Sequence, residues 1–212
     1  MPTKTYYYDF EVSLIGVEPR IWRRFLLRMN CDFHELHDTI QKACGWQDYH
    51  LYEFREWVEG ESWSKRKTIA TSPYSEPEEI DEVMADARQV KLGDVIGFDS
   101  HAKLVYEYDF GDGWEHLIEV KDIQQLAGTT RRKLIAGERA FPPEDCGGIL
   151  GYEEAVEAFH MTKAQLAAIR EEDERDEIQT IRTWLGDWEP EKFDFDMVAD
   201  LMKRPVRYPE PY

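Results

Sequence analysis

Apolar and polar residues alternate near the start of the chain, over residues 6–15. One face of this segment carries five apolar side chains: Tyr6, Tyr8, Phe10, Val12 and Leu14. The alternation predicts a half-buried strand. Residues 16–19 contain glycine and proline and predict a turn, and residues 20–29 (RIWRRFLLRM) predict a second strand. We therefore expect the chain to begin with a β-hairpin.

The next element is predicted to be a helix over residues 32–44. Its apolar stripe recurs at helical spacing and consists of Phe33, Leu36, Ile40 and Cys44. Asp32 and Glu35 have the spacing of a capping box, and Gly45 stands where a left-handed residue commonly ends a helix. Residues 46–54 (WQDYHLYEF) then predict a third strand, with His50 on the same face as two aromatic residues.

The segment YEYDFGDGWEH, residues 106–116, is predicted to join two more strands within residues 92–122. A three-residue loop, 111–113, sets Phe110 opposite Trp114 and Tyr108 opposite His116, and so keeps the rings on one face. It also gives Gly113 the left-handed conformation that such loops need. We therefore expect this register.

The same register places acidic residues on the other face of the hairpin. Asp109 falls opposite Glu115, and Glu107 and Glu119 lie further along. Because directly opposed like charges destabilise a sheet, we expect them to be neutralised unless this face is open to water. The candidates are the arginines of residues 20–29, a bound cation, and a raised carboxyl pKa.

The order of the elements predicts an α+β fold, with a mostly antiparallel sheet in the order β-β-α-β-β-β covered by helices. It also resembles a β-grasp arrangement. Residues 58–89 predict a loop with a short helix at 78–88, and residues 123–151 a turn-rich connection. Helices follow at 153–160, 162–176 and 196–202, with a turn carrying Trp184 and Trp188. We expect a single domain over residues 1–212, sheet-rich at about 5–151 and helical at about 152–203, with a tail at 204–212.

Composition narrows the function classes. The 212 residues are 42% hydrophobic and 13% aromatic, which is enough for a packed core. The formal charge of −18 disfavours wide binding to nucleic-acid phosphates. Cys31, Cys44 and Cys146 form no C-x-x-C pair, so neither a zinc ribbon nor a disulfide framework is indicated. No segment resembles a signal peptide or a membrane span, and we expect a cytoplasmic protein.

The motif PPEDCGG, residues 142–148, is a second acidic cluster. Its prolines stiffen the loop, and its two glycines permit backbone conformations that other residues avoid. Glu144, Asp145 and Cys146 are therefore expected to sit on a shaped loop, which suits a binding site. The same loop also suits a structural role in which Asp145 accepts backbone N–H bonds. Cys146 beside two acids is expected to have little thiolate character.

The candidate site residues come from these motifs. We expect a ligand or protein partner to contact His50, Asp109, Asp112, Trp114, His116, Glu144, Asp145, Cys146 and Tyr152. A divalent metal ion is the cofactor considered. Its ligands would be Asp109, Asp112, Glu144 and His116, with His37 and His50 as further donors. No histidine pair has the H-x-x-x-H spacing that is typical of a metal site on a helix. An anion would contact Arg20, Arg23 and Arg24, unless these arginines neutralise carboxylates on the sheet.

Five stretches together resemble one family: IWRR, IQKACGWQDYHLYEF, YEYDFGDGWEH, FPPEDCGGILGY and FDFDMVADLM. The chain is similar to the plasmid pRiA4b ORF-three-like family from about residue 6 to residue 202. The resemblance implies an α+β domain found in bacteria and archaea, on plasmids, mobile elements and chromosomes. Related proteins are labelled TnpR-like passenger proteins of insertion elements. The resemblance supplies no catalytic residues.

Three function classes follow. We favour a non-catalytic binding module that uses the YDFGDGWEH hairpin and the PPEDCGG loop to contact a protein partner or small ligand. The second is a metal-dependent hydrolase acting on a phosphoester, with a divalent ion held by Asp109, Asp112, Glu144 and Asp145 and with His116 or His50 as ligand or base. The third is a DNA-associated accessory protein that uses the arginines of residues 20–29 and the basic clusters at 65–67 and 131–133. The acidic charge, without a helix-turn-helix pattern, disfavours a recombinase.

Overall fold

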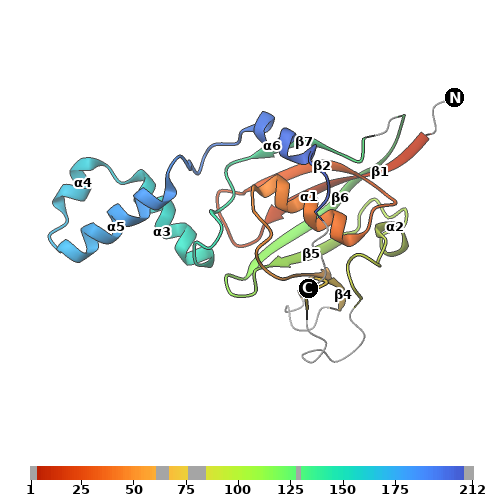
Figure 1. The fold of residues 1–212 in the computed structure, drawn as a ribbon, viewed down its shortest axis with the longest axis horizontal. Coiled ribbons are helices and arrows are strands. Elements are labelled where there is room, and N and C mark those ends of the chain that lie inside the picture. Colours follow the sequence, from red (N-terminus) through yellow and green to blue (C-terminus); the bar gives the residue numbers. More distant parts are fainter. Residues whose placement is uncertain (1–3, 61–66, 76–84, 128–129, 208–212) are drawn as a thin grey trace.

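The computed structural model describes residues 4–60, 67–75, 85–127 and 130–207, and it has the expected α+β fold (Figure 1). The strands are β1 (Lys4–Leu14), β2 (Trp22–Arg28), β3 (Tyr52–Glu56), β4 (Thr68–Thr71), β5 (Lys103–Tyr108), β6 (Trp114–Ala127) and β7 (Arg132–Glu138). The helices are α1 (Phe33–Cys44), α2 (Leu92–Val95), α3 (Gly148–His160), α4 (Lys163–Ala168), α5 (Glu172–Leu185) and α6 (Phe195–Met202).

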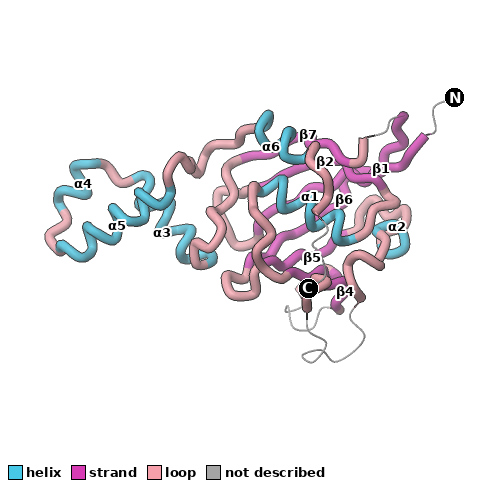
Figure 2. The backbone as a smooth tube through the Cα atoms, in the orientation of Figure 1, coloured by secondary structure: helices cyan, strands magenta, loops and turns pink. Residues whose placement is uncertain are grey.

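The strands form one sheet of seven, in the order β4-β3-β5-β6-β1-β2-β7, and every neighbouring pair is antiparallel. The expected hairpin of β1 and β2 is present, with Phe10 opposite Phe25. Helix α1 lies across one face of this sheet (Figure 2). Its Leu36 and Ile40 pack in the same buried cluster as the aromatic side chains of the strands. Each such fully buried side chain stabilises the fold by about 1.5–3 kcal/mol.

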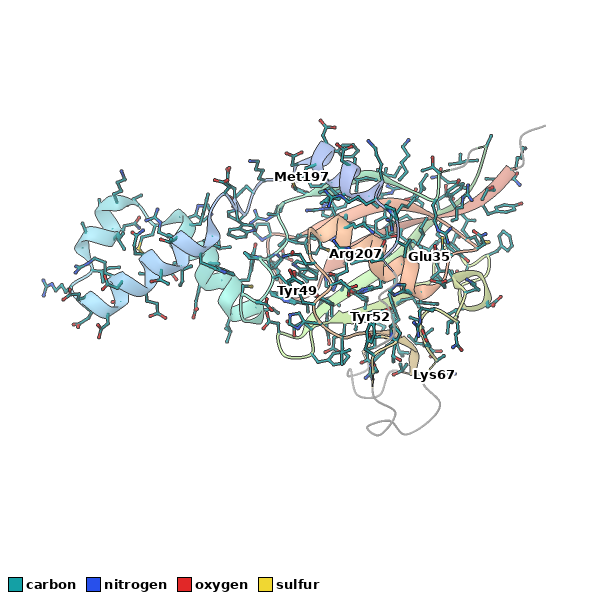
Figure 3. All side chains as sticks on the ribbon, in the orientation of Figure 1. Glu35, Tyr49, Tyr52, Lys67, Met197 and Arg207 are labelled. Carbon is teal, nitrogen blue, oxygen red and sulfur yellow. The ribbon has the colours of Figure 1, made fainter. Side chains whose placement is uncertain are left out.

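Helix α1 begins and ends as the sequence predicts. The Asp32 side chain accepts the backbone N–H of Glu35, the Glu35 side chain accepts that of Asp32, and Gly45 is left-handed at φ 85°. The polar side of the helix is also buried, because residues 202–207 lie over it (Figure 3). His34 Nε2 lies 2.6 Å from the carbonyl oxygen of Arg207, and Lys42 Nζ donates to that of Pro205.

Several local predictions for the sheet are wrong. Residues 92–95 form helix α2 rather than a strand, because Leu92 anchors this turn in the core. The third strand begins at Tyr52 and not at residue 46, because Asp48 is left-handed at φ 63°. Residues 123–127 and 132–138 are strands and not turns: β6 continues to Ala127, and β7 pairs with β2.

Two predicted helices also differ. Residues 162–176 are interrupted, because Ile169 is extended and its carbonyl oxygen accepts a hydrogen bond from the Arg175 guanidinium at 3.1 Å. Trp184 accordingly lies within α5 instead of a turn. Of the helix expected at 78–88, residues 78–84 lie outside the described residues and residues 85–88 form a bridge and a turn.

Helices α3, α4 and α5 form a helical arm, residues 148–185, that projects from one end of the sheet (Figure 1). Helix α6 returns from the arm to pack against α1 and β7. Within the described residues, no helix combines the length and apolar character that a membrane span requires.

Candidate functional site

Three loops meet beside the start of the helical arm: residues 46–51, the hairpin loop 109–113, and residues 142–147. We call them the three-loop site. Gly147 donates its backbone N–H to Asp112 Oδ2 at 3.1 Å, and the Trp46 indole donates to the carbonyl oxygen of Pro142 at 2.9 Å. The two motifs that the sequence singles out are therefore neighbours. Figure 3 labels Tyr49 of this site, on the side of the sheet that faces α3.

The hairpin loop is longer than predicted. Tyr108 pairs with Trp114 and Tyr106 with His116, so five residues and not three connect β5 to β6. The cause is Asp109, which is left-handed at φ 56° and whose Oδ1 accepts the backbone N–H of Gly111 at 3.1 Å. The prediction for Gly113 is confirmed, since it is left-handed at φ 67°.

Lengthening the loop by two residues leaves the side chains of β5 and β6 on their expected faces, because the side-chain period of a strand is two, but it moves Phe110 out of the strand and into the loop. It changes the opposed acids, however, so Glu115 faces Glu107 and not Asp109. On its other side Glu107 faces Glu53 of β3. Burial, then the charges of Glu53 and Glu115, raise the pKa of Glu107 to about 7.

The three arginines considered for the acidic hairpin, Arg20 before β2 and Arg23 and Arg24 on β2, have other partners. Arg24 pairs with Asp9 at 2.8 Å and Arg20 with Glu11 at 2.8 Å, both on β1. Arg23 is buried, donates to backbone carbonyls and stacks against Phe141 and Phe193. Arginines, a bound cation and a raised carboxyl pKa were the three expected ways to relieve the opposed charges of the hairpin. The raised pKa is the one that applies to Glu107. The three arginines have separate partners and do not gather around one point.

Glu144 ties the PPEDCGG loop to the sheet. Its Oε1 accepts the Tyr108 hydroxyl at 2.5 Å, and its Oε2 accepts the backbone N–H of Gln47 at 2.8 Å. The motif glycines allow the close approach that follows. A Cβ atom on Gly148 would lie 2.7 Å from the carbonyl oxygen of Asp112, and one on Gly151 would overlap the carbonyl oxygen of Cys146. Glu144 and both glycines therefore hold the loops together.

His50 and two aspartates gather at the surface of the three-loop site. His50 Nε2 lies 2.7 Å from Asp145 Oδ1 and 3.5 Å from Asp109 Oδ2. One donor atom from each residue lies within 4.8 Å of the others. Asp109 is buried, His50 is half-buried and Asp145 is exposed, so the cluster opens to solvent. Asp145 is left-handed at φ 61°, as is Asp109, a conformation that is costly without glycine and concentrates at functional sites.

The other predicted donors lie elsewhere. Asp112 and Glu144 accept backbone N–H bonds. His116 is fully buried, its Nδ1 lies 3.1 Å from the carbonyl oxygen of Trp114, and burial lowers its pKa to about 4. His37 stacks on Tyr52 and bonds to Tyr106 and Asp48. Of the predicted metal donors, His50, Asp109 and Asp145 form the cluster, and Asp112, Glu144, His116 and His37 do not join it.

The apolar residues that solvent reaches differ from those predicted. Trp114 and Tyr152 are 1% and 3% exposed, so they support the loops from beneath. Tyr49 is 64% exposed and Phe110 is 49% exposed, and they precede His50 and follow Asp109 in the chain. Sequence reasoning missed this role, although both aromatic residues sit in loops next to polar candidates. Burial, Asp112 and Asp145 raise the pKa of the Cys146 thiol to about 12, as its acidic neighbours suggested.

Two arginines of the basic clusters considered for DNA have acidic partners. Arg131 pairs with Glu35, and Arg132 pairs with Asp38. Residues 65 and 66 of the other cluster lie outside the described residues. DNA association therefore gains no supporting observation from these positions.

Comparison with known proteins places these features in a family. The chain is 36% identical over 150 residues to the uncharacterised protein y4hQ of Sinorhizobium fredii (strain NBRC 101917 / NGR234), a match that covers 70% of this chain and 71% of that protein. The crystal structure of MM3350, a protein of unknown function from Methanosarcina mazei Go1, superimposes with a TM-score of 0.72 at 30% identity and covers 93% of this chain and 98% of that one. The family profile described as plasmid pRiA4b ORF-3-like protein matches residues 6–197. The chain therefore belongs to the plasmid pRiA4b ORF-3-like family.

Proposed function

We propose that the chain is a binding module whose three-loop site holds a cationic group, such as the side chain of an arginine or lysine on a partner protein. The observation that carries this proposal is the cluster of His50, Asp109 and Asp145 at the surface. The three loops contain five acidic residues, Asp48, Asp109, Asp112, Glu144 and Asp145, and no lysine or arginine. A cluster of like charges attracts the opposite charge.

The exposed rings support the same conclusion. A guanidinium or ammonium group gains about 0.5–2 kcal/mol when it lies over an aromatic face. Tyr49 and Phe110 offer such faces beside the cluster. Cys146 is kept as a thiol at neutral pH, which favours binding over covalent catalysis by this residue.

The proposal is tested by nuclear magnetic resonance of the ¹⁵N-labelled protein titrated with N-acetyl-arginine amide. We expect saturable chemical-shift changes at residues 109–113 and 144–147. The expected dissociation constant is of order 1 mM, which corresponds to a binding free energy of about −4 kcal/mol. Asp145→Asn should weaken this binding severalfold, and Phe110→Ala less. Glu153→Gln, which removes an equal charge from an exposed position on α3, is the matched control.

The outcome that refutes the proposal is an even spread of small shifts over the acidic surface. Equal weakening by Asp145→Asn and Glu153→Gln would mean the same, because the cation would then respond only to the overall charge.

A divalent-metal site is the second candidate function, and the distances within the cluster favour it. One imidazole nitrogen and two carboxylate oxygens within 4.8 Å of one another are donors that suit Zn²⁺ or Mn²⁺. Three protein ligands would leave positions open for water, as in catalytic metal sites. This arrangement is what the phosphoester hydrolase hypothesis requires, with His50, Asp109 and Asp145 from the residues that it names.

Calorimetric titration with Zn²⁺, Mn²⁺ and Mg²⁺ separates the two candidates. A metal site predicts that one ion binds per chain and that His50→Ala abolishes this binding. The control is His160→Ala on α3, whose imidazole lies beside Glu191 away from the cluster, and this variant should bind the ion unchanged. Binding that survives His50→Ala would remove this candidate. A phosphoesterase assay is justified only where stoichiometric binding is found.

A further inference from the structure

The helical arm carries a groove between α3 and α5, away from the three-loop site. The groove encloses about 270 Å³. Its floor is apolar and consists of Ala158 of α3, Met161 just after the end of α3, and Ile178 and Ile181 of α5. The two isoleucines are three apart in α5, so they form a short ridge that faces the end of α3.

The arm has few buried side chains of its own. Among the residues that the structure describes, Leu185 is the one buried side chain of α5, and α4 has none. Met161, Ile178 and Ile181 are therefore half-buried, although each is large and apolar. A pair of helices that leaves its apolar ridges partly open can gain by packing a third helix against them.

The rim of the groove is acidic and unneutralised. It consists of Glu154 and Glu157 on α3 and Glu174 and Glu177 on α5, all exposed. None of the four forms an ion pair with another residue in the described ranges. Residues 148–185 contain nine acidic and four basic residues, so the charge of the arm favours a basic occupant.

We infer that the groove binds a basic amphipathic helix of a partner protein. Apolar side chains at positions i, i+3 and i+7 of that helix would lie on the floor, and flanking lysines or arginines would pair with the glutamates. Recognition of an amphipathic helix by a groove between helices is a recurring binding mode. A second copy of this chain is disfavoured as the occupant, because its own arm is equally acidic.

The test uses the whole chain and a fluorescein-labelled synthetic peptide of 18 residues built from leucine and lysine, patterned as an amphipathic helix. A peptide of the same composition with a scrambled order is the control for charge alone. Fluorescence polarisation should show tighter binding of the patterned peptide, by tenfold or more, and binding that weakens as salt is raised.

Variants locate the contact. Glu157→Gln with Glu174→Gln should weaken binding about three- to tenfold, the range expected for two exposed ion pairs. Glu153→Gln with Asp176→Asn removes the same charge from the same two helices outside the groove, and should change binding less than twofold. Ile181→Ala should also weaken binding. Circular dichroism establishes that each variant is folded.

Equal binding of the two peptides, or equal weakening by the two double variants, would overturn the inference, because attraction would then come from charge alone. Sedimentation that shows a dimer dispersed by Ile181→Ala would overturn it as well, since a second copy would then fill the groove. Under the proposed function, lysines of the peptide are also ligands of the three-loop site. The two double variants are therefore compared again in an Asp145→Asn background, where the weakening caused by the groove variants should persist.

Discussion

Replacing Glu107 by glutamine should stabilise the protein at alkaline pH and have little effect at acid pH. The carboxyl of Glu107 lies between Glu53 and Glu115 on neighbouring strands, and its pKa is raised from 4.5 to about 7, first by burial and then by these two charges. The folded state therefore binds more protons than the unfolded state between these values. Stability that is present at pH 4.5 is lost as the pH rises through 7.

The magnitude follows from the shift. Each pKa unit corresponds to 1.36 kcal/mol, so the full shift would amount to about 3 kcal/mol. Because Glu107 is only half-buried, solvent screening reduces the expected effect to about 1–2 kcal/mol. Glu107→Gln should therefore raise the free energy of unfolding by this amount at pH 8.5, and by less than ~0.5 kcal/mol at pH 5.

Urea unfolding of both proteins between pH 5 and 8.5 measures the difference directly. Glu119→Gln, on the neighbouring strand β6 and the same face of the sheet, is the matched control. Burial raises the pKa of Glu119, but Lys103 and Lys121 outweigh burial and lower it, so this variant should be destabilised at pH 8.5. A carboxyl resonance of Glu107 that titrates near 4.5, or a glutamine effect that is equal at both pH values, would refute the reasoning.

Three further predictions concern the loops, the core and α1. Gly148→Ala should lower the free energy of unfolding by about 2–4 kcal/mol, because its φ is +71° and the new Cβ would meet Asp112. Gly113→Ala, at φ +67° but in open space, should lower it by about 1 kcal/mol. Thermal melts compare the two variants. His116→Phe should reduce the loss of stability between pH 6.5 and 4. Because the pKa of His116 is lowered to about 4 in the folded state, the unfolded state takes up a proton first as the pH falls, which destabilises the wild-type fold by up to about 3 kcal/mol. Urea unfolding of both proteins across this range measures the difference. Asp32→Ala should lower the free energy of unfolding by about 1 kcal/mol through loss of the capping box, and an unchanged melting temperature would contradict this.

Local signals in the sequence predicted the elements that local interactions determine. The boundaries of α1 follow from Asp32, Glu35 and Gly45, each of which acts within one turn of chain. Strand β7 escaped prediction because its inward-facing series begins with Arg132, a charged residue that binds backbone carbonyls of the C-terminal segment. Such a tertiary role leaves no trace in the alternation of apolar residues.

The candidate site shows the same division. The motif residues pointed to the two loops that meet, and the reason for motif glycines such as Gly148 is their close approach to the opposite loop. The hairpin register could not be deduced, because it depends on the turn made by the Asp109 side chain. Which aromatic residues face solvent depends in turn on that register and on the layer beneath, so Trp114 and Phe110 exchanged their expected roles.

The segment that covers the polar side of α1 has a consequence for biosynthesis. Arg132, Asp38, Lys42 and His34 all bond to main-chain groups of residues 202–207. Because a ribosome makes the chain from its N-terminus, these four side chains emerge before the groups that satisfy them. The nascent sheet and α1 can therefore collapse early, but the layer over α1 closes only after the last helix has been made. Until then, Arg132 and Lys42 have Asp38 as a partner, and water must take the place of the main-chain groups of residues 202–207.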